Sequence, residues 1–140
     1  MIADHPQASH PDPQLTKNQA LVLGALANDG GALSAYSILD QLRDEGFRAP
    51  LQVYRALDKL LEFGLVHRLE SLNAFIACSH PDCESHSTIA FAICETCGDV
   101  AEFADDVAAE HLQGWAKREK FRLKKTIIEL RGTCNTCMAA

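Results

Sequence analysis

The amino-acid sequence predicts an α+β protein made of two small units, a helical unit that ends in a β-hairpin and a shorter unit of strands and one helix. Three observations predict this organisation. Apolar residues recur at helical spacing before residue 64 and alternate at strand spacing after it, and a short polar segment with a proline separates two such stretches. The chain has 140 residues, 47% apolar and 23% charged, which is typical of a folded protein of one or two domains.

Charge and apolar runs exclude several classes of protein. No apolar run approaches the roughly 20 residues that span a bilayer. The first fourteen residues hold three prolines and lack the apolar core of a secretion signal. We therefore expect residues 1–14 to be a mobile tail and the protein to be cytoplasmic, with no membrane partner. A net charge of −6 argues against a general electrostatic attraction to nucleic acid but allows a local one.

Residues 15–64 predict three helices. The first begins after Thr16, which forms a capping box with Gln19, and it ends at a pair of glycines. Ser34 caps the second helix. The third begins at Pro50, which suits a first helical turn because its missing N–H would be unpaired there, and Gly64 ends it.

The third helix has an apolar side, predicted to be buried, and a polar side. The apolar side consists of Val53, Ala56, Leu57, Leu60 and Leu61, and the polar side of Gln52, Tyr54, Arg55, Asp58, Lys59 and Glu62. Residues 65–70 and 74–78 then alternate as a hairpin. Three helices and a hairpin within residues 15–78 form the winged-helix layout, which places its last helix in the major groove of DNA. An ordinary small helical bundle remains an alternative on this pattern.

A second unit is predicted at residues 87–140, after a linker at residues 79–86. We expect strands at 88–94, near 100–103 and at 122–131, with a helix from residue 105 to about residue 120. This helix is predicted to bury Val107, Ala108, Leu112 and Trp115. The apolar faces exceed what one helix covers, so a second copy of the chain is the expected partner.

Six cysteines without a secretion signal indicate metal binding or catalysis rather than disulfides. Four of them form two Cys-x-x-Cys pairs, Cys94 with Cys97 and Cys134 with Cys137. Two such pairs supply the four thiolates of a structural zinc site. The rival is a dithiol redox centre, which is disfavoured because too few residues follow Cys134 for a supporting helix. No nucleophile, base and orienting group line up, so no enzyme is predicted.

Further potential metal ligands surround the linker. They are His67, Cys78, His80, Cys83, His86 and Glu102. Singly, each would be an ordinary histidine, small apolar cysteine or surface acid. Together, with soft sulfur, imidazole and a carboxylate, they favour zinc over iron or manganese.

These motifs resemble those of the ferric uptake regulator family of bacterial metal-dependent repressors. The resemblance rests on Val-Tyr-Arg-Ala-Leu-Asp-Lys-Leu at residues 53–60, Gly-Leu-Val-His at residues 64–67, Cys-x-x-Cys-Gly at residues 94–98 and the last Cys-x-x-Cys. It is strongest with the zinc uptake regulators, because His-x-x-Glu-Ser-x-Asn at residues 67–73 leads to Cys78. The His-His-Asp-His cluster that iron-sensing members carry before their first Cys-x-x-Cys is absent.

The resemblance implies a homodimer with an N-terminal winged-helix DNA-binding domain and a C-terminal dimerisation domain. It implies two zinc ions per subunit. The structural ligands would be Cys94, Cys97, Cys134 and Cys137, and the regulatory ligands His67, Cys78, His86 and Glu102.

Tyr54 and Arg55 fall where family members touch the operator, and Gln52 and Lys59 share that side of the helix. Gln52 departs from the family, which usually has Thr there. Cys83 is an extra thiol, and with His80 and His111 it could form an additional site or replace a ligand. We expect His111 to be a partly buried helical histidine.

The sequence therefore predicts a zinc-responsive transcriptional repressor that binds double-stranded operator DNA and controls zinc-uptake genes, with no small-molecule substrate. The alternatives are a family member that senses another metal or peroxide and, from other classes, a thiol oxidoreductase or a zinc-stapled interaction module.

Overall fold

The computed structural model describes residues 14–78 and 88–139. Its first elements are α1 (Lys17–Asp29), α2 (Ala35–Gln41), a 3-10 helix (Arg43–Glu45), α3 (Pro50–Glu62), β1 (Val66–Leu69) and β2 (Ala74–Ala77). After them come β3 (Thr88–Cys94), β4 (Val100–Phe103), α4 (Asp106–Arg118), β5 (Thr126–Gly132) and α5 (Asn135–Met138). The predicted tail, apart from residue 14, and the predicted linker, with His80, Cys83 and His86, lie outside the described residues.

The three predicted helices of the first unit are present and capped as expected. Thr16 Oγ1 accepts from the Gln19 amide at 3.2 Å, and Gln19 Oε1 accepts from the Thr16 amide at 3.1 Å. Ser34 caps α2, and Pro50 is the first residue of α3. The helices enclose a core in which the most deeply buried side chains are Val22, Leu26, Ile38, Val53, Leu57 and Leu60. The apolar periodicity identified the buried sides because burial of apolar area drives helix packing.

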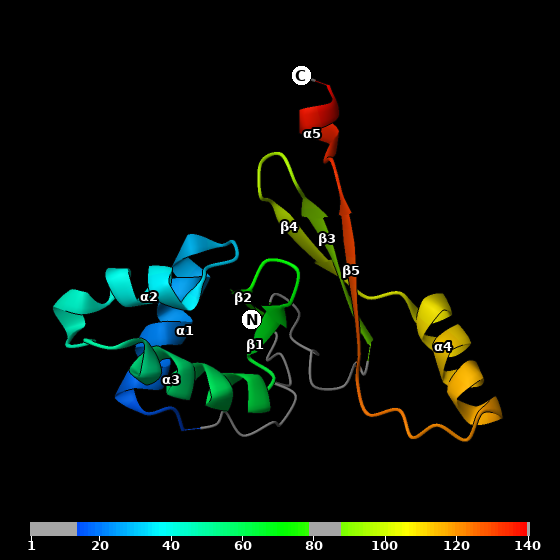
Figure 1. The fold of residues 1–140 in the computed structure, drawn as a ribbon, viewed down its shortest axis with the longest axis horizontal. Helices are drawn as coiled ribbons and strands as arrows, with labels where there is room; N and C mark the ends of the chain where they lie inside the picture. Colours follow the sequence, from blue (N-terminus) through cyan, green and yellow to red (C-terminus); the bar gives the residue numbers. More distant parts are fainter. Residues whose placement is uncertain (1–13, 79–87, 140) are drawn as a thin grey trace, which may run out of the picture.

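The β1–β2 hairpin contacts both units of the chain (Figure 1). Val66 and Phe75 belong to the helical core, whereas Leu69 and Ile76 pack with residues of β3 in a second core. Successive strand residues point to opposite faces, so the hairpin supplies one face to each core. The sequence predicted two units joined by a linker, and the structure adds a shared apolar contact between them.

The second unit contains a three-stranded sheet in the order β4-β3-β5. β3 lies in the centre, antiparallel to β4 and parallel to β5. α4 provides the crossover that a parallel pair requires. β5 begins at Thr126, four residues later than predicted. Lys120 adopts a left-handed φ of 54° just before the segment that leads into this strand.

The predicted buried side of α4 was wrong. Val107 is 77% exposed and Trp115 is 48% exposed, Leu112 is also exposed, and Ala116 is the only buried residue of this helix. His111, expected to be partly buried, is exposed as well. In Figure 1, α4 stands beside β5 rather than across the sheet. The apolar periodicity is therefore real, but this chain does not supply the surface that would cover it. No helix in the described ranges is long and apolar enough to cross a membrane.

Candidate metal centres and DNA-contacting surface

The four predicted structural cysteines gather at one end of the sheet. Cys94 ends β3, Cys97 lies in the following turn, Cys134 directly precedes α5 and Cys137 lies within it. All four are free, and their sulfur atoms lie within 4.8 Å of one another. The sulfurs of Cys97 and Cys134 are 3.7 Å apart. Four thiolates about 2.3 Å from a zinc ion would have sulfurs about 3.8 Å apart, so the cluster has the size of a zinc site.

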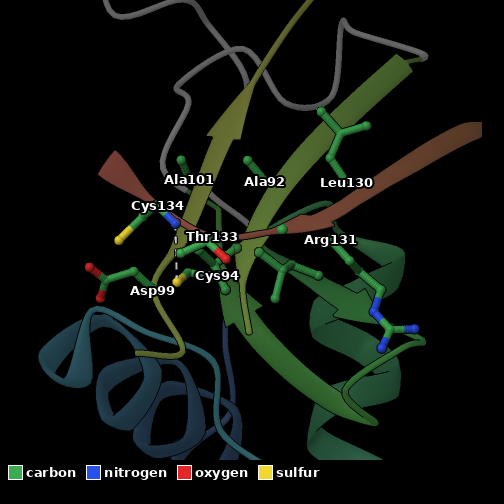
Figure 2. A pocket seen from close by; sticks show the side chains of 11 residues that line it. Ala92, Cys94, Asp99, Ala101, Leu130, Arg131, Thr133 and Cys134 are labelled. Atoms are coloured by element: carbon green, nitrogen blue, oxygen red, sulfur yellow. Dashed lines mark hydrogen bonds between the residues drawn. The ribbon is translucent and has the colours of Figure 1, made fainter. Parts of the chain in front are cut away.

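Backbone amides hold this cluster in shape. The Cys134 amide donates to Cys94 Sγ at 3.3 Å, as drawn in Figure 2, and the Cys97 amide donates to the same sulfur at 3.5 Å. These bonds favour the thiolate and lower the pKa of Cys94 to about 6. The hydrogen-bonded thiol of Cys134 raises the pKa of Cys137 to about 12. Gly98, with a φ of 81°, permits the tight turn between the first pair and β4.

A single helical turn follows Cys134, where the sequence argument expected too few residues for a supporting helix. Residues Asn135–Met138 form this turn, and the Met138 amide donates to the Cys134 carbonyl at 3.0 Å. A cysteine that precedes a helix is a feature of dithiol redox centres. Here, however, both cysteine pairs share one cluster, and four converging sulfurs are the arrangement of a metal site.

Three of the other potential ligands meet where the two units touch. His67 comes from β1, Cys78 directly follows β2, and Glu102 comes from β4. Glu102 Oε1 lies 3.6 Å from His67 Nε2 and 3.8 Å from Cys78 Sγ. All three ligand atoms lie within 4.8 Å of one another. We call this group the hinge cluster.

The hinge cluster is shielded from solvent. The side chains of His67 and Glu102 are each 3% exposed, and the His67 ring packs against Phe91 with centroids 5.5 Å apart. A buried carboxylate is costly unless a cation or hydrogen-bond donors compensate its charge. This donor set therefore suits a metal cation. The fourth residue predicted for this site, His86, lies outside the described residues, and so do His80 and Cys83. The structure thus brings three of the four predicted ligands together.

A polar contact beside the hinge cluster was not predicted. Ser71, in the turn of the hairpin, donates to Glu129 Oε1 of β5 through its hydroxyl at 2.9 Å and its amide at 3.2 Å. The two residues are 58 positions apart, so no local pattern signals this contact.

The polar side of α3 is exposed as predicted, but its residues differ in what they do. Gln52 Oε1 accepts from the amides of Arg48 and Ala49 at 2.7 and 3.1 Å, because Ala49 offers no side-chain cap at the start of α3. Lys59 pairs with Glu62 at 3.2 Å. Arg55 and Tyr54 are exposed.

A groove lies beside this side of α3. It has a volume of about 700 Å³ and is lined by α3 residues and by Thr16, Asn18 and Gln19 at the start of α1. The Gln52 side chain thus has a capping role that sequence reasoning missed. The signal was a Gln three residues after the N-cap position.

Two comparisons of sequence relate this chain to known proteins. A model of the ferric uptake regulator family matches residues 12–131. The zinc uptake regulation protein of Escherichia coli K12 is 38% identical over 126 residues, covering 89% of this chain and 73% of that protein. The ferric uptake regulation protein of Legionella pneumophila is 28% identical over 108 residues, covering 75% and 76%.

Solved structures give the same result. A zinc uptake regulator complexed with zinc and DNA has a TM-score of 0.84 and 38% identity, covering 90% of this chain and 84% of that one. Holo XcZur has a TM-score of 0.81 and 40% identity, covering 90% and 87%. The fold is therefore that of these regulators, a winged helix followed by an α+β unit. With most of its length matched by the family model, this chain belongs to the ferric uptake regulator family and resembles its zinc uptake regulators.

Proposed function

We propose that this chain is a zinc-responsive transcriptional repressor that binds double-stranded operator DNA as a zinc-loaded homodimer and controls zinc-uptake genes. The observation that carries the proposal is the hinge cluster. His67 and Cys78 belong to the hairpin side and Glu102 to the sheet of the second unit. A cation held by all three fixes the angle between the units. The similar proteins support zinc and DNA as the ligands, because one is named for zinc uptake regulation and another was solved with both.

The proposal assigns two zinc ions to each subunit. Cys94, Cys97, Cys134 and Cys137 hold a structural ion, which stabilises a small unit whose own core is limited. The hinge cluster and His86 hold the regulatory ion. One thiolate and one carboxylate balance the charge of Zn²⁺, which removes negative charge that would otherwise repel DNA.

We assign residues 15–78 to the DNA-binding domain, 79–86 to the hinge and 87–140 to the dimerisation domain. α3 enters the major groove. Arg55 makes a bidentate contact with guanine, and Tyr54 contacts a thymine methyl group. Lys59 contacts phosphate, and the amide nitrogen of Gln52 is available to DNA because the oxygen caps the helix.

The exposed apolar residues of the second unit support a homodimer. Leu112, Trp115, Phe121, Ile127 and Leu130 are each at least 36% exposed. β5 is an edge strand, whose unpaired backbone groups can pair with another strand. A second copy would cover both features at once.

Operator binding with different metals tests this function. DNA from the promoter of a zinc-uptake operon of the source genome is titrated with the protein in the presence of Zn²⁺, Fe²⁺ or Mn²⁺. We expect tight, sequence-specific binding with Zn²⁺ alone. Equal or stronger binding with Fe²⁺ or Mn²⁺ would favour a regulator of another metal. Titratable thiols without tightly held metal would favour a thiol oxidoreductase.

A further inference from the structure

The positive charge of this chain is concentrated in one segment at the end of α4 and before β5. Six of its thirteen lysine and arginine residues lie between residues 117 and 125, accompanied by one acid, Glu119. We call these nine residues the basic segment. Its cations are Lys117, Arg118, Lys120, Arg122, Lys124 and Lys125. All six are exposed, and none forms an ion pair with another residue of the described ranges.

The helical unit that carries α3 has no such surplus. Residues 14–78 contain six lysines and arginines against seven acids. Two of these cations are committed to neighbours, because Arg43 pairs with Asp40 at 3.0 Å and Lys59 with Glu62 at 3.2 Å. Affinity for DNA depends strongly on neutralisation of phosphates by lysine and arginine. The unit that would read the bases therefore lacks most of the charge that binding requires.

The basic segment lies on the same side of the molecule as α3. β5 has Cys134 and α5 at one end and the basic segment at the other. In Figure 1 the segment that joins α4 to β5 lies along the lower side of the molecule, as α3 does, and α5 lies at the opposite extreme. DNA that contacts α3 thus runs along the side to which this segment belongs.

The backbone of the segment is ordered by local contacts. The Phe121 amide donates to the Ala116 carbonyl at 2.7 Å, and the Lys120 amide donates to the Lys117 carbonyl at 3.2 Å. The rings of Phe121 and Trp115 pack with centroids 5.8 Å apart. Cations in the last turn of α4 also complement the helix dipole. That explanation covers Lys117 and Arg118 but not the four cations beyond the helix.

We propose that the basic segment binds the phosphate backbone of DNA beside the bases that α3 reads. The proposal rests on the proposed function, since it assumes that α3 reads an operator. Each subunit contributes one segment, and the contact is independent of sequence. It supplies the electrostatic part of the affinity, whereas Arg55 and Tyr54 supply the sequence preference.

The test measures DNA affinity as a function of salt. Zinc-loaded protein is titrated into a fluorescent mixed-sequence duplex of about 40 base pairs at several KCl concentrations between about 50 and 300 mM. Two variants remove charge, Arg122→Gln and a quadruple Gln variant of Lys120, Arg122, Lys124 and Lys125. Arg131→Gln is the matched control, because Arg131 is exposed near the other end of β5 and pairs with Glu95 at 2.9 Å.

Each phosphate contact contributes about 0.9 to the slope of log affinity against log salt. Arg122→Gln should therefore reduce the slope of a dimer by about 1.8, and the quadruple variant should bind more than about tenfold more weakly at 100 mM salt. Arg131→Gln and the charge-conserving Arg122→Lys should keep the wild-type slope. Circular dichroism and zinc content establish that each variant is folded.

Two results would overturn the proposal. One is an unchanged affinity and slope for the quadruple variant while the wild type binds DNA in a zinc-dependent manner, which leaves the proposed function intact. The other is unchanged DNA binding with lost binding to vesicles containing anionic lipid, which assigns the segment to a membrane surface. Failure of the wild type to bind any DNA with zinc instead contradicts the proposed function itself.

Discussion

Individual ligands in the two clusters are held in different ways. The Cys94 sulfur accepts two backbone amides, so the chain itself prepares a thiolate for a cation. In the hinge cluster, Glu102 and His67 are enclosed between the hairpin and the sheet. Loss of a sulfur from the first cluster removes part of the folding free energy of the second unit. Loss of a hinge ligand should instead affect how the two units are coupled.

Cys78→Ser should abolish the zinc response and leave the fold intact. Serine has a similar size but binds zinc poorly at neutral pH, so the change removes coordination and keeps packing. We expect one zinc ion per subunit instead of two, by metal analysis, and operator affinity that no longer depends on free zinc. Cys83→Ser serves as the control, since it removes the other thiol near the hinge. A wild-type response in Cys78→Ser and a lost response in Cys83→Ser would show that the linker thiol is the ligand.

Arg55→Ala should weaken operator binding by about 1–3 kcal/mol and relax the base preference at one position in each half-site. Arg55 is exposed and forms no ion pair with another described residue, so its guanidinium can approach a base. Affinities for a set of operators with single-base changes measure this effect. If affinity for every sequence falls equally and the salt slope drops by about one contact, Arg55 touches phosphate instead.

The lowered pKa of Cys94 gives zinc binding at the four-cysteine cluster a characteristic pH dependence. Each cysteine must lose its proton to bind zinc. With a pKa of about 6, Cys94 has already lost its proton well above pH 6 and releases one only at lower pH. Cys137, with a pKa of about 12, is protonated throughout this range.

The number of protons released on zinc binding should therefore rise as the pH falls through about 6, and zinc affinity should fall more steeply there. Calorimetry in buffers with different heats of ionisation, at about pH 5 and about pH 8, measures this number. An equal release at both values would contradict the assigned thiolate. The hinge variant Cys78→Ser is the suitable protein, because it restricts zinc binding to the four cysteines.

At the level of elements, α4 and β5 present apolar side chains that this chain does not cover. Trp115 is 48% exposed and Leu130 is 50% exposed, and a groove of about 280 Å³ lies between the end of α4 and the start of β5. Burying such side chains against a second copy gains about 25 cal/mol per Å² of apolar area, before the costs of association.

Trp115→Ser should shift the dimer towards monomer without removing the structural zinc. The reason is that the side chain lies on the proposed interface and outside both metal clusters. Tyr36→Ser is the matched control, since Tyr36 is also an exposed aromatic residue, 63% exposed, but lies on α2. Sedimentation equilibrium should show a dissociation constant at least about tenfold higher for Trp115→Ser, the effect of roughly 1.4 kcal/mol. Equal dissociation of the two variants would place the interface elsewhere.

At the scale of the whole molecule, two contacts besides the hinge cluster join the units. One is the apolar core in which Leu69 and Ile76 meet Ile89, Phe91 and Ile93. The other is the pair of hydrogen bonds from Ser71 to Glu129. A metal at the hinge cluster would therefore act together with protein contacts that favour the same arrangement, which lowers the free energy that the metal must supply.

Glu129→Ala should raise the free zinc concentration needed for half-maximal operator binding by about fivefold. Hydrogen bonds to a charged group contribute about 1.5–3 kcal/mol, and solvent exposure reduces this to about 1 kcal/mol here. Glu95→Ala is the control, because Glu95 pairs with Arg131 within the second unit. Operator titrations at buffered zinc concentrations measure the midpoint. An unchanged midpoint for Glu129→Ala would mean that this contact does not couple the units.

Local patterns accounted for the elements and for part of the candidate sites. The capping box of Thr16, the Pro50 start of α3 and the strand that ends at Cys94 are confirmed, because each depends on residues close in sequence. The same holds for the exposed side of α3. The burial predicted for Val107, Leu112 and Trp115 was wrong, because apolar periodicity identifies a side that needs covering and does not say which chain covers it.

The sequence by itself determined the residue types available for zinc, the two cysteine pairs and the helix that displays Arg55. Each of these is a matter of composition or short spacing. Only the tertiary structure decided that β3 and β5 pair in parallel and thereby bring Cys94 to Cys134. It also decided that the hairpin packs against β3, which encloses His67 beside Glu102. Contacts between residues dozens of positions apart depend on how whole faces pack, and short-range patterns carry no record of that packing.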